Sequence, residues 1–177
     1  MKLFYITLIF FINIISSNLI AQIIVVVNVQ TLIDQNSNYI DATKDIERSQ
    51  KKYLKIFEEK EIELKKMLEE IEKSKLILNE NEINTKIENY NNQLNIFSND
   101  VDKFNFHYQN QIIEMRETLL KEIIILLENY AMTNNIDIIL DSTSYLVASN
   151  SIDITEDIKK QLNNLKIVLK YENFEKN

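Results

Sequence analysis

The sequence of 177 residues contains no cysteine, no glycine, no proline and no tryptophan. Without cysteine, the chain can form no disulfide and carry no lipid-modified cysteine. Without glycine, it lacks the residue that lets a backbone approach phosphate closely, which excludes Walker-type loops and Rossmann fingerprints and disfavours ATP-driven chemistry. Without proline, nothing forces a helix to break. Long, uninterrupted helices are therefore the expected structure.

Histidine is nearly absent as well, which leaves little for catalysis. The one histidine, His107, lies between Phe106 and Tyr108, and the sequence pairs no nucleophile with it. No spacing of carboxylates matches a calcium loop. We therefore predict no catalytic residue, no metal site and no cofactor. We interpret His107 as an ordinary, partly exposed helix position, with acid–base or ligand chemistry as the alternative.

The N-terminal segment is the longest apolar run of the chain. Lys2 precedes apolar residues from Leu3 to Ile15, and small or polar residues follow up to Ala21. This order predicts a cleavable secretory signal over residues 1–21, with an uncleaved membrane anchor as the alternative. Removal of the segment leaves 19 basic and 27 acidic residues, a net charge of −8. Such a balance disfavours nucleic acid and anionic membranes as partners.

A heptad repeat of apolar residues dominates the middle of the chain. Steps of four and three alternate without a miss along Ile83, Ile87, Tyr90, Leu94, Phe97, Val101, Phe104 and Tyr108. This is the spacing of a coiled-coil seam. A looser repeat precedes it at Phe57, Leu64, Ile71 and Leu78. The two repeats predict an antiparallel helical hairpin over residues 37–134, with its tip near residues 79–84 and Ser37 or Asn38 as the first N-cap.

The two ends of the chain carry the signs of β structure. We predict three strands, at Ile23–Asn28, Ile136–Asp141 and Tyr145–Ala148, the last two joined by a polar turn. Val29–Asp34 suits a short helical turn. Asp153 and Glu156 resemble a capping box that opens a last helix carrying Ile158, Leu162 and Leu165. The sequence gives no assignment after residue 166.

These elements together predict an α+β fold that is predominantly α. The helical hairpin forms an arm inserted in a small β body made of residues 22–36 and 135–177. One chain cannot cover the edges and apolar faces of such a small sheet, so we expect the body to assemble with other copies. The residues predicted to mediate this oligomerisation are Ile24, Val26, Ile138, Leu140 and Leu146.

The arrangement resembles the Skp (OmpH-like) periplasmic chaperones. The resemblance rests on the signal segment, the strand ending in Val27-Asn28-Val29, the charged hairpin, the stretch Asp137–Asp141, and above all residues 150–158, Asn-Ser-Ile-Asp-Ile-Thr-Glu-Asp-Ile. It implies a periplasmic homotrimer whose three arms enclose a cavity that holds unfolded outer-membrane proteins without ATP. The acidic charge of this chain disfavours lipopolysaccharide as a further partner.

Apolar residues that face away from the heptad seam are the candidates for client binding. Four of them occupy such positions, namely Ile62, Leu76, Ile96 and Phe106. Incidental exposure, or packing between arms, is the alternative interpretation. For the whole protein, the alternatives to a chaperone are a structural coiled-coil spacer or adaptor of the cell envelope and, less favoured, an enzyme.

Overall fold

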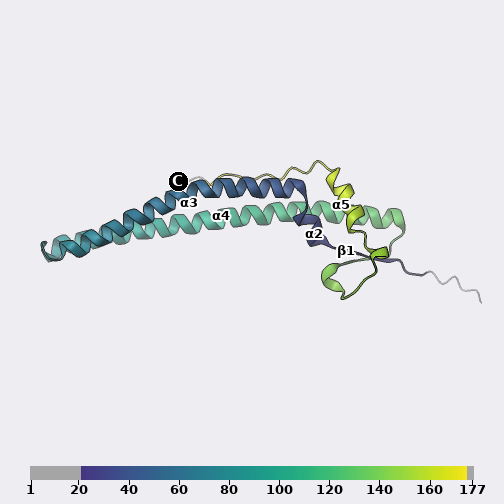
Figure 1. The fold of residues 1–177 in the computed structure, drawn as a ribbon, viewed down its shortest axis with the longest axis horizontal. Coiled ribbons are helices and arrows are strands. Elements are labelled where there is room, and N and C mark those ends of the chain that lie inside the picture. Colours follow the sequence, from purple (N-terminus) through teal and green to yellow (C-terminus); the bar gives the residue numbers. More distant parts are fainter. Residues whose placement is uncertain (1–20, 175–177) are drawn as a thin grey trace, which may run out of the picture.

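The computed structural model describes residues 21–174, so the predicted signal segment lies almost wholly outside the described residues. Figure 1 shows two long helices side by side, which form an arm that projects from a small body containing both β1 and α5. In chain order the elements are β1 (Ile24–Val27), α2 (Val29–Asp34), α3 (Ser37–Ser74), α4 (Glu80–Asn134), β2 (Ile138–Asp141), the 3-10 turns η2 (Ser142–Ser144) and η3 (Asn150–Ile152), and α5 (Thr155–Asn163). The chain is predominantly helical, as predicted.

The predicted helical hairpin is confirmed. Helix α3 has 38 residues and α4 has 55, and the two heptad series face one another between them. Phe57, Leu64 and Ile71 of α3 and Phe104 and Tyr108 of α4 are buried. The N-cap of α3 is Asn36 rather than Ser37 or Asn38, because the Asn36 side chain accepts a hydrogen bond from the Tyr39 amide at 3.1 Å.

The tip of the hairpin lies a few residues earlier than predicted. Helix α3 ends at Ser74, and α4 begins at Glu80 with Asn79 as its N-cap. The Asn79 side chain accepts from the Glu82 amide at 3.1 Å, and the Glu82 carboxylate accepts from the Asn79 amide at 3.1 Å. This capping box brings the polar stretch 79–84 into the helix, so the turn is made by residues 75–78.

The body contains a two-stranded parallel sheet instead of the predicted three strands. Strand β1 pairs with β2, with Ile24 opposite Ile138 and Val27 opposite Asp141, and the whole hairpin forms the connection between the strands. An isolated bridge joins Val26 to Asp153 on the other side of β1.

The predicted third strand, Tyr145–Ala148, is wrong for the described chain. The Asp141 side chain accepts hydrogen bonds from the amide and hydroxyl of Thr143, at 3.3 and 2.7 Å, and this local pairing coils residues 142–144 into η2 instead of a hairpin turn. The following segment therefore loops out of the body (Figure 1), and Leu146 is fully exposed.

The last helix begins at Thr155, and its predicted capping box is also wrong. Its N-cap is Ile154, which makes no side-chain cap, while Asp153 accepts a hydrogen bond from the Thr155 amide at 2.8 Å. The Asp153 side chain thus accepts from the amide two residues later. The predicted capping box needs a hydrogen bond from the amide three residues later, that of Glu156. Ile158 and Leu162 are buried as expected, whereas Leu165 lies beyond the helix and is exposed.

Two apolar cores stabilise the molecule. The body core joins β1, α2 and α5 to the far end of α4, and it includes Val27, Leu32, Leu119, Ile123 and Ile158. The arm core lies between α3 and α4 and is rich in aromatic residues, namely Phe57, Phe104, Tyr108 and Phe174. Because Phe174 comes from the C-terminal segment, the arm is more than a two-helix coil.

Candidate functional site

All four predicted client-binding residues are exposed on the arm, but they do not gather in one place. Leu76 lies in the tip turn rather than on α3 as predicted, since the helix ends at Ser74. It is 91% exposed, and its neighbour Ile77, which sequence reasoning missed, is 83% exposed. The apolar triplet Leu76-Ile77-Leu78 at the end of a heptad series was the signal that could have revealed this apolar tip.

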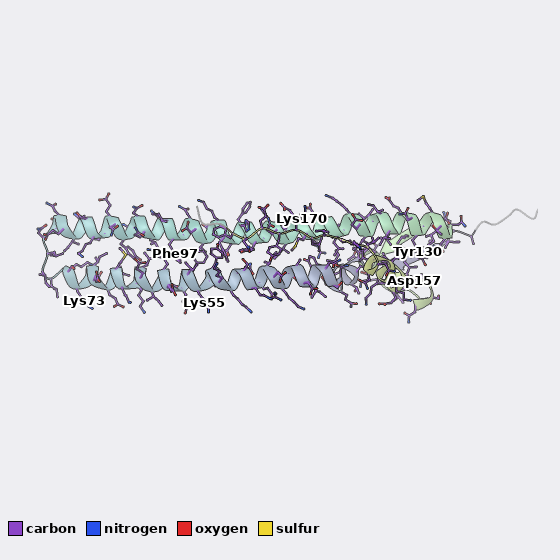
Figure 2. All side chains as sticks on the ribbon, turned by 90° about the horizontal axis from the view of Figure 1, so that it is seen from above. Lys55, Lys73, Phe97, Tyr130, Asp157 and Lys170 are labelled. Carbon is purple, nitrogen blue, oxygen red and sulfur yellow. The ribbon has the colours of Figure 1, made fainter. Side chains whose placement is uncertain are left out.

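Ile96 lines a shallow groove between the two helices. The groove has a volume of about 320 Å³, and Ile56, Phe57, Ile96 and Phe97 form its apolar wall. Lys60 lies at the rim and donates a hydrogen bond to the Gln93 side chain at 3.2 Å. Figure 2 shows Phe97 between the helices. Ile62 and Phe106 do not line this groove. The predicted residues therefore make dispersed contacts along the arm.

The C-terminal tail lies along the arm, whereas the sequence analysis placed it in the β body without assigning it a helix or strand. Residues 166–174 form no helix or strand, and Figures 1 and 2 show this segment running back beside α3 and α4, with Lys170 on it. Ile167, Leu169 and Tyr171 pack on the two cores, whereas Val168 and Lys170 between them are exposed. This alternation has the period of two expected of an extended chain with one face on a surface.

Phe174 anchors the described tail in the arm core. It is 7% exposed, and its ring contacts Tyr53, Phe104 and His107 with centroid distances of 5.3, 5.6 and 5.7 Å. The three ring contacts have edge-on geometry, which is favourable for aromatic pairs. Burial of a phenylalanine side chain stabilises a protein by about 1.5–3 kcal/mol.

Side chains of the arm bind the backbone of the tail. The Tyr53 hydroxyl donates a hydrogen bond to the Phe174 carbonyl, and the Tyr108 hydroxyl accepts one from the Phe174 amide at 3.3 Å. Gln111 accepts from the Glu172 amide at 2.9 Å, and the His107 ring nitrogen Nε2 lies 2.9 Å from the Glu172 carbonyl oxygen. His107 is a partly exposed position of α4, as predicted, and it also contacts the tail.

The residues predicted to mediate oligomerisation differ in their surroundings. Ile24, Ile138 and Leu146 are exposed at the surface of the body, and Leu140 is half-buried. Val26 is 3% exposed, because the chain itself covers it through the bridge to Asp153. A contact with another copy is therefore open to four of the five residues without rearrangement, and their role remains a prediction.

Two ionisable side chains join the elements of the body. Burial alone would raise the pKa of Asp141, but hydrogen bonds from Thr143, Val29 and Ser142 stabilise the carboxylate and hold its pKa below the ordinary value. The Val29 bond, 3.1 Å long, ties the end of β2 to the start of α2. On α4, burial raises the pKa of Tyr130, and the nearby Asp157 carboxylate on α5 raises it further (Figure 2).

The described residues give no sign of a metal centre or a membrane span. Within residues 21–174, no group of three or more histidine, aspartate or glutamate side chains is placed to hold a metal ion. In that same part of the chain, none of the helices combines the length and apolar character needed to cross a bilayer.

A long helical arm inserted between the two strands of a small parallel sheet defines the architecture of this protein. The chain belongs to the OmpH-like family, since the model of the family "Outer membrane protein (OmpH-like)" matches residues 23–162. The match runs from β1 into α5, and it includes every part of the sequence resemblance except the signal segment. It confirms the predicted family.

A solved structure shows the same fold. It is the crystal structure of a protein described as an outer membrane chaperone (OmpH-like) from Caulobacter crescentus CB15, which superposes with a TM-score of 0.71 at 8% sequence identity. The superposition covers 86% of this chain and 91% of the other. A comparison with curated proteins gives no match. The family match therefore shows the family, and the superposition shows that the two proteins share the fold.

Proposed function

We propose that this protein is a periplasmic holdase that binds unfolded outer-membrane β-barrel proteins without ATP and prevents their aggregation. The observation that carries the proposal is the set of exposed apolar side chains dispersed along a projecting arm, Ile62, Leu76, Ile96 and Phe106 among them. The periplasmic location rests on the predicted signal over residues 1–21 and on the family. Enzyme activity has no place in the proposal.

The arm suits weak binding of many sequences. A holdase contacts chains that share no sequence, so dispersed apolar contacts serve it better than one deep pocket shaped for one ligand. A net charge of −7 for the whole chain gives little long-range attraction to acidic clients, so apolar contacts carry more of the affinity. The neighbouring pair Leu76 and Ile77 at the tip adds the most exposed apolar surface of the arm.

The proposal includes a homotrimer assembled through the body. Among the described residues, β2 pairs only with β1, so the outer edge of β2 has no partner strand. Unpaired strand edges favour pairing with another chain. The segment 145–148, with Leu146 and Val147 almost fully exposed, is close in sequence to β2 and is the part of the body that another copy would cover. Three arms on one such body would enclose the client cavity.

A dilution experiment tests the chaperone function against the structural-spacer alternative. A porin unfolded in urea is diluted into buffer with stoichiometric amounts of the purified protein, and light scattering reports aggregation. A holdase suppresses the scattering without ATP. A spacer leaves the scattering at the level of the porin alone, and that result would exclude the proposed function.

Substitution of the four exposed residues tests the client surface. Changing Ile62, Leu76, Ile96 and Phe106 to serine should weaken porin binding by about 1 kcal/mol for each effective contact, because the variant no longer buries these apolar side chains against the client. The fold and assembly should persist, since none of the four is buried. A matched control changes the exposed Asn91, Asn92 and Asn95 of α4 to serine. Wild-type affinity in the quadruple variant would remove these positions from the client surface.

Sedimentation tests the trimer. Val26→Asp places a charge in the core of one chain, so it should disrupt the fold as well as the assembly. Ile138→Asp and Leu146→Asp alter exposed positions, so they should separate the copies and leave the helical content of each chain unchanged. A wild-type protein that sediments as a monomer, or a Leu146→Asp variant that remains a trimer, would count against assembly through this segment.

A further inference from the structure

The surface beneath the C-terminal tail has the features of a peptide-binding site. Four arm side chains, those of Tyr53, His107, Tyr108 and Gln111, contact backbone atoms of Glu172 and Phe174. Backbone contacts do not depend on the bound sequence. One side chain, Phe174, is buried against the rings of Tyr53, Phe104 and His107. The surface thus accepts an extended chain and selects it mainly by one aromatic residue.

The tail does not pack closely against α3 along its whole length. A depression of about 380 Å³ lies where the tail meets α3, lined by Ser49, Tyr53, Tyr171 and Asn173 among others. The packed side chains of the tail alternate with exposed ones, and in its described part only Asn173 forms a side-chain hydrogen bond with the arm, from Ser49 at 2.9 Å. Ordering an extended segment without internal backbone bonds is opposed by its conformational entropy. Such a segment is a replaceable occupant.

We infer that this surface is a binding site for an extended client segment that bears an aromatic side chain, and that the tail occupies it until a client displaces it. We call this surface the tail groove, made of Ser49, Tyr53, Phe104, His107, Tyr108 and Gln111. The inference deepens the proposed holdase function and rests on it for the identity of the occupant. A client would dock its backbone on Tyr108 and Gln111 and its aromatic ring where Phe174 now lies.

Competition between tail and client also means that the tail groove is covered when no client is present. A site that is free in only a fraction of molecules shows an affinity lowered by that fraction. The tail therefore covers the aromatic surface in the absence of client. An unfolded chain can still displace the tail, because it presents many aromatic side chains at once.

The first test opens the groove. The purified protein and its Phe174→Ser variant are titrated against a fluorescein-labelled, amidated peptide with the sequence of residues 167–174, Ile-Val-Leu-Lys-Tyr-Glu-Asn-Phe. The variant should bind the peptide about ten-fold more tightly than the wild type, because its own tail no longer competes. Val168→Ser, at an exposed tail position, is the control and should bind as the wild type does. A peptide with serine in place of its phenylalanine should not bind.

A second variant closes the groove and does not depend on removing a buried ring. The chain has no cysteine, so Ser49→Cys with Asn173→Cys introduces a single pair whose parent side chains already touch. The oxidised protein should bind the labelled peptide about ten-fold more weakly than the same protein after reduction. Cross-links between chains instead of within one chain would show that a second copy supplies the tail, and would overturn the inference.

The unfolded porin separates this inference from the proposed function. If Phe174→Ser raises affinity for the peptide and for the porin, the tail groove is a client site. If peptide affinity is unchanged, or if the porin is held equally well by wild type and variant, the inference is wrong, and the holdase function stands as long as the wild type suppresses aggregation. If neither protein suppresses aggregation while peptide affinity rises, the holdase proposal fails and the groove remains a peptide site.

Discussion

The two halves of the arm follow the same heptad pattern but bury it to different degrees. In the half near the body, Ile46, Phe104 and Tyr108 are at most 3% exposed. In the half near the tip, Leu64 and Ile71 of α3 are buried, but the α4 seam residues Ile83, Ile87 and Tyr90 are only half-buried and Leu94 is 39% exposed. Seam spacing thus fixes which residues face the partner helix, and it does not fix how completely they leave water.

The difference arises from a third layer. Two helices contact one another along a single line and leave each seam residue open on its flanks. Near the body, the tail covers one flank, and Phe174 closes the aromatic cluster. The described part of the tail ends at Phe174 and makes no contact with the tip half of the arm. Local opening is easier where fewer apolar contacts are made, so the tip half is the part of the arm best suited to adapt to different clients.

The largest predicted effect contrasts one seam residue from each half. Phe104→Ala should lower the free energy of unfolding by about 3–5 kcal/mol, because it leaves a cavity in the aromatic cluster. Leu94→Ala should lower it by less than about 1 kcal/mol, since much of that side chain is already in contact with water. Urea unfolding followed by circular dichroism measures both, at one protein concentration because assembly affects stability. Equal losses at the two sites would refute the contrast between the halves.

A smaller effect is expected from removing the third layer alone. Phe174→Ala should destabilise the arm by about 1.5–3 kcal/mol, the contribution of one buried phenylalanine. Hydrogen exchange followed by mass spectrometry should show faster exchange in the helices near the body and unchanged exchange near the tip. Val168→Ala, an exposed tail change, serves as the control. Faster exchange at the tip in the Phe174 variant would mean that the tail stabilises the arm as a whole.

The smallest predicted effect belongs to the body and depends on pH. The pKa of Asp141 is lowered in the folded protein, so its contribution to stability is present above the unfolded pKa, near about 3.9, and is lost as the pH falls through the lower folded pKa. Asp141→Asn should destabilise the protein by about 0.5–1 kcal/mol at pH 7, because the amide accepts hydrogen bonds less strongly than the carboxylate. The stabilities of the two proteins should converge in acid. A constant difference from pH 7 to pH 2, measured by urea unfolding, would contradict the assignment.

The hairpin was the most predictable part of the fold. Helix-forming residues in a heptad spacing determine local structure and the buried face together, so α3 and α4 followed from the sequence with errors of a few residues at their ends. The errors at the N-terminal ends of the helices came from asparagine caps, and a further asparagine takes the position often held by glycine after α4, whose end was predicted correctly. Asn36 and Asn79 cap helices, and Asn135 ends α4 in the left-handed region with φ of 53°.

The body was less predictable, because its strands depend on partners far away in the sequence. The short apolar runs at Tyr145–Ala148 and Ile138–Asp141 look alike, but only the second pairs with β1. The side chain of Asp141 turns the chain into η2 before a hairpin can form, and such a local competition is not visible in a hydrophobic pattern. The client-binding positions were predicted from the seam and are exposed, while their function remains to be tested.

Composition and periodicity by themselves determined a long helical hairpin without disulfides, and a few residues between 150 and 158 pointed to the OmpH-like family. Only the tertiary structure decided that the tail lies on the arm, that Phe174 completes its aromatic core and that His107 contacts the tail. The physical reason is that a heptad describes contacts between neighbouring turns of paired helices. The tail has no such repeat, and its place is set by an aromatic cavity and backbone partners that exist only once α3 and α4 have come together.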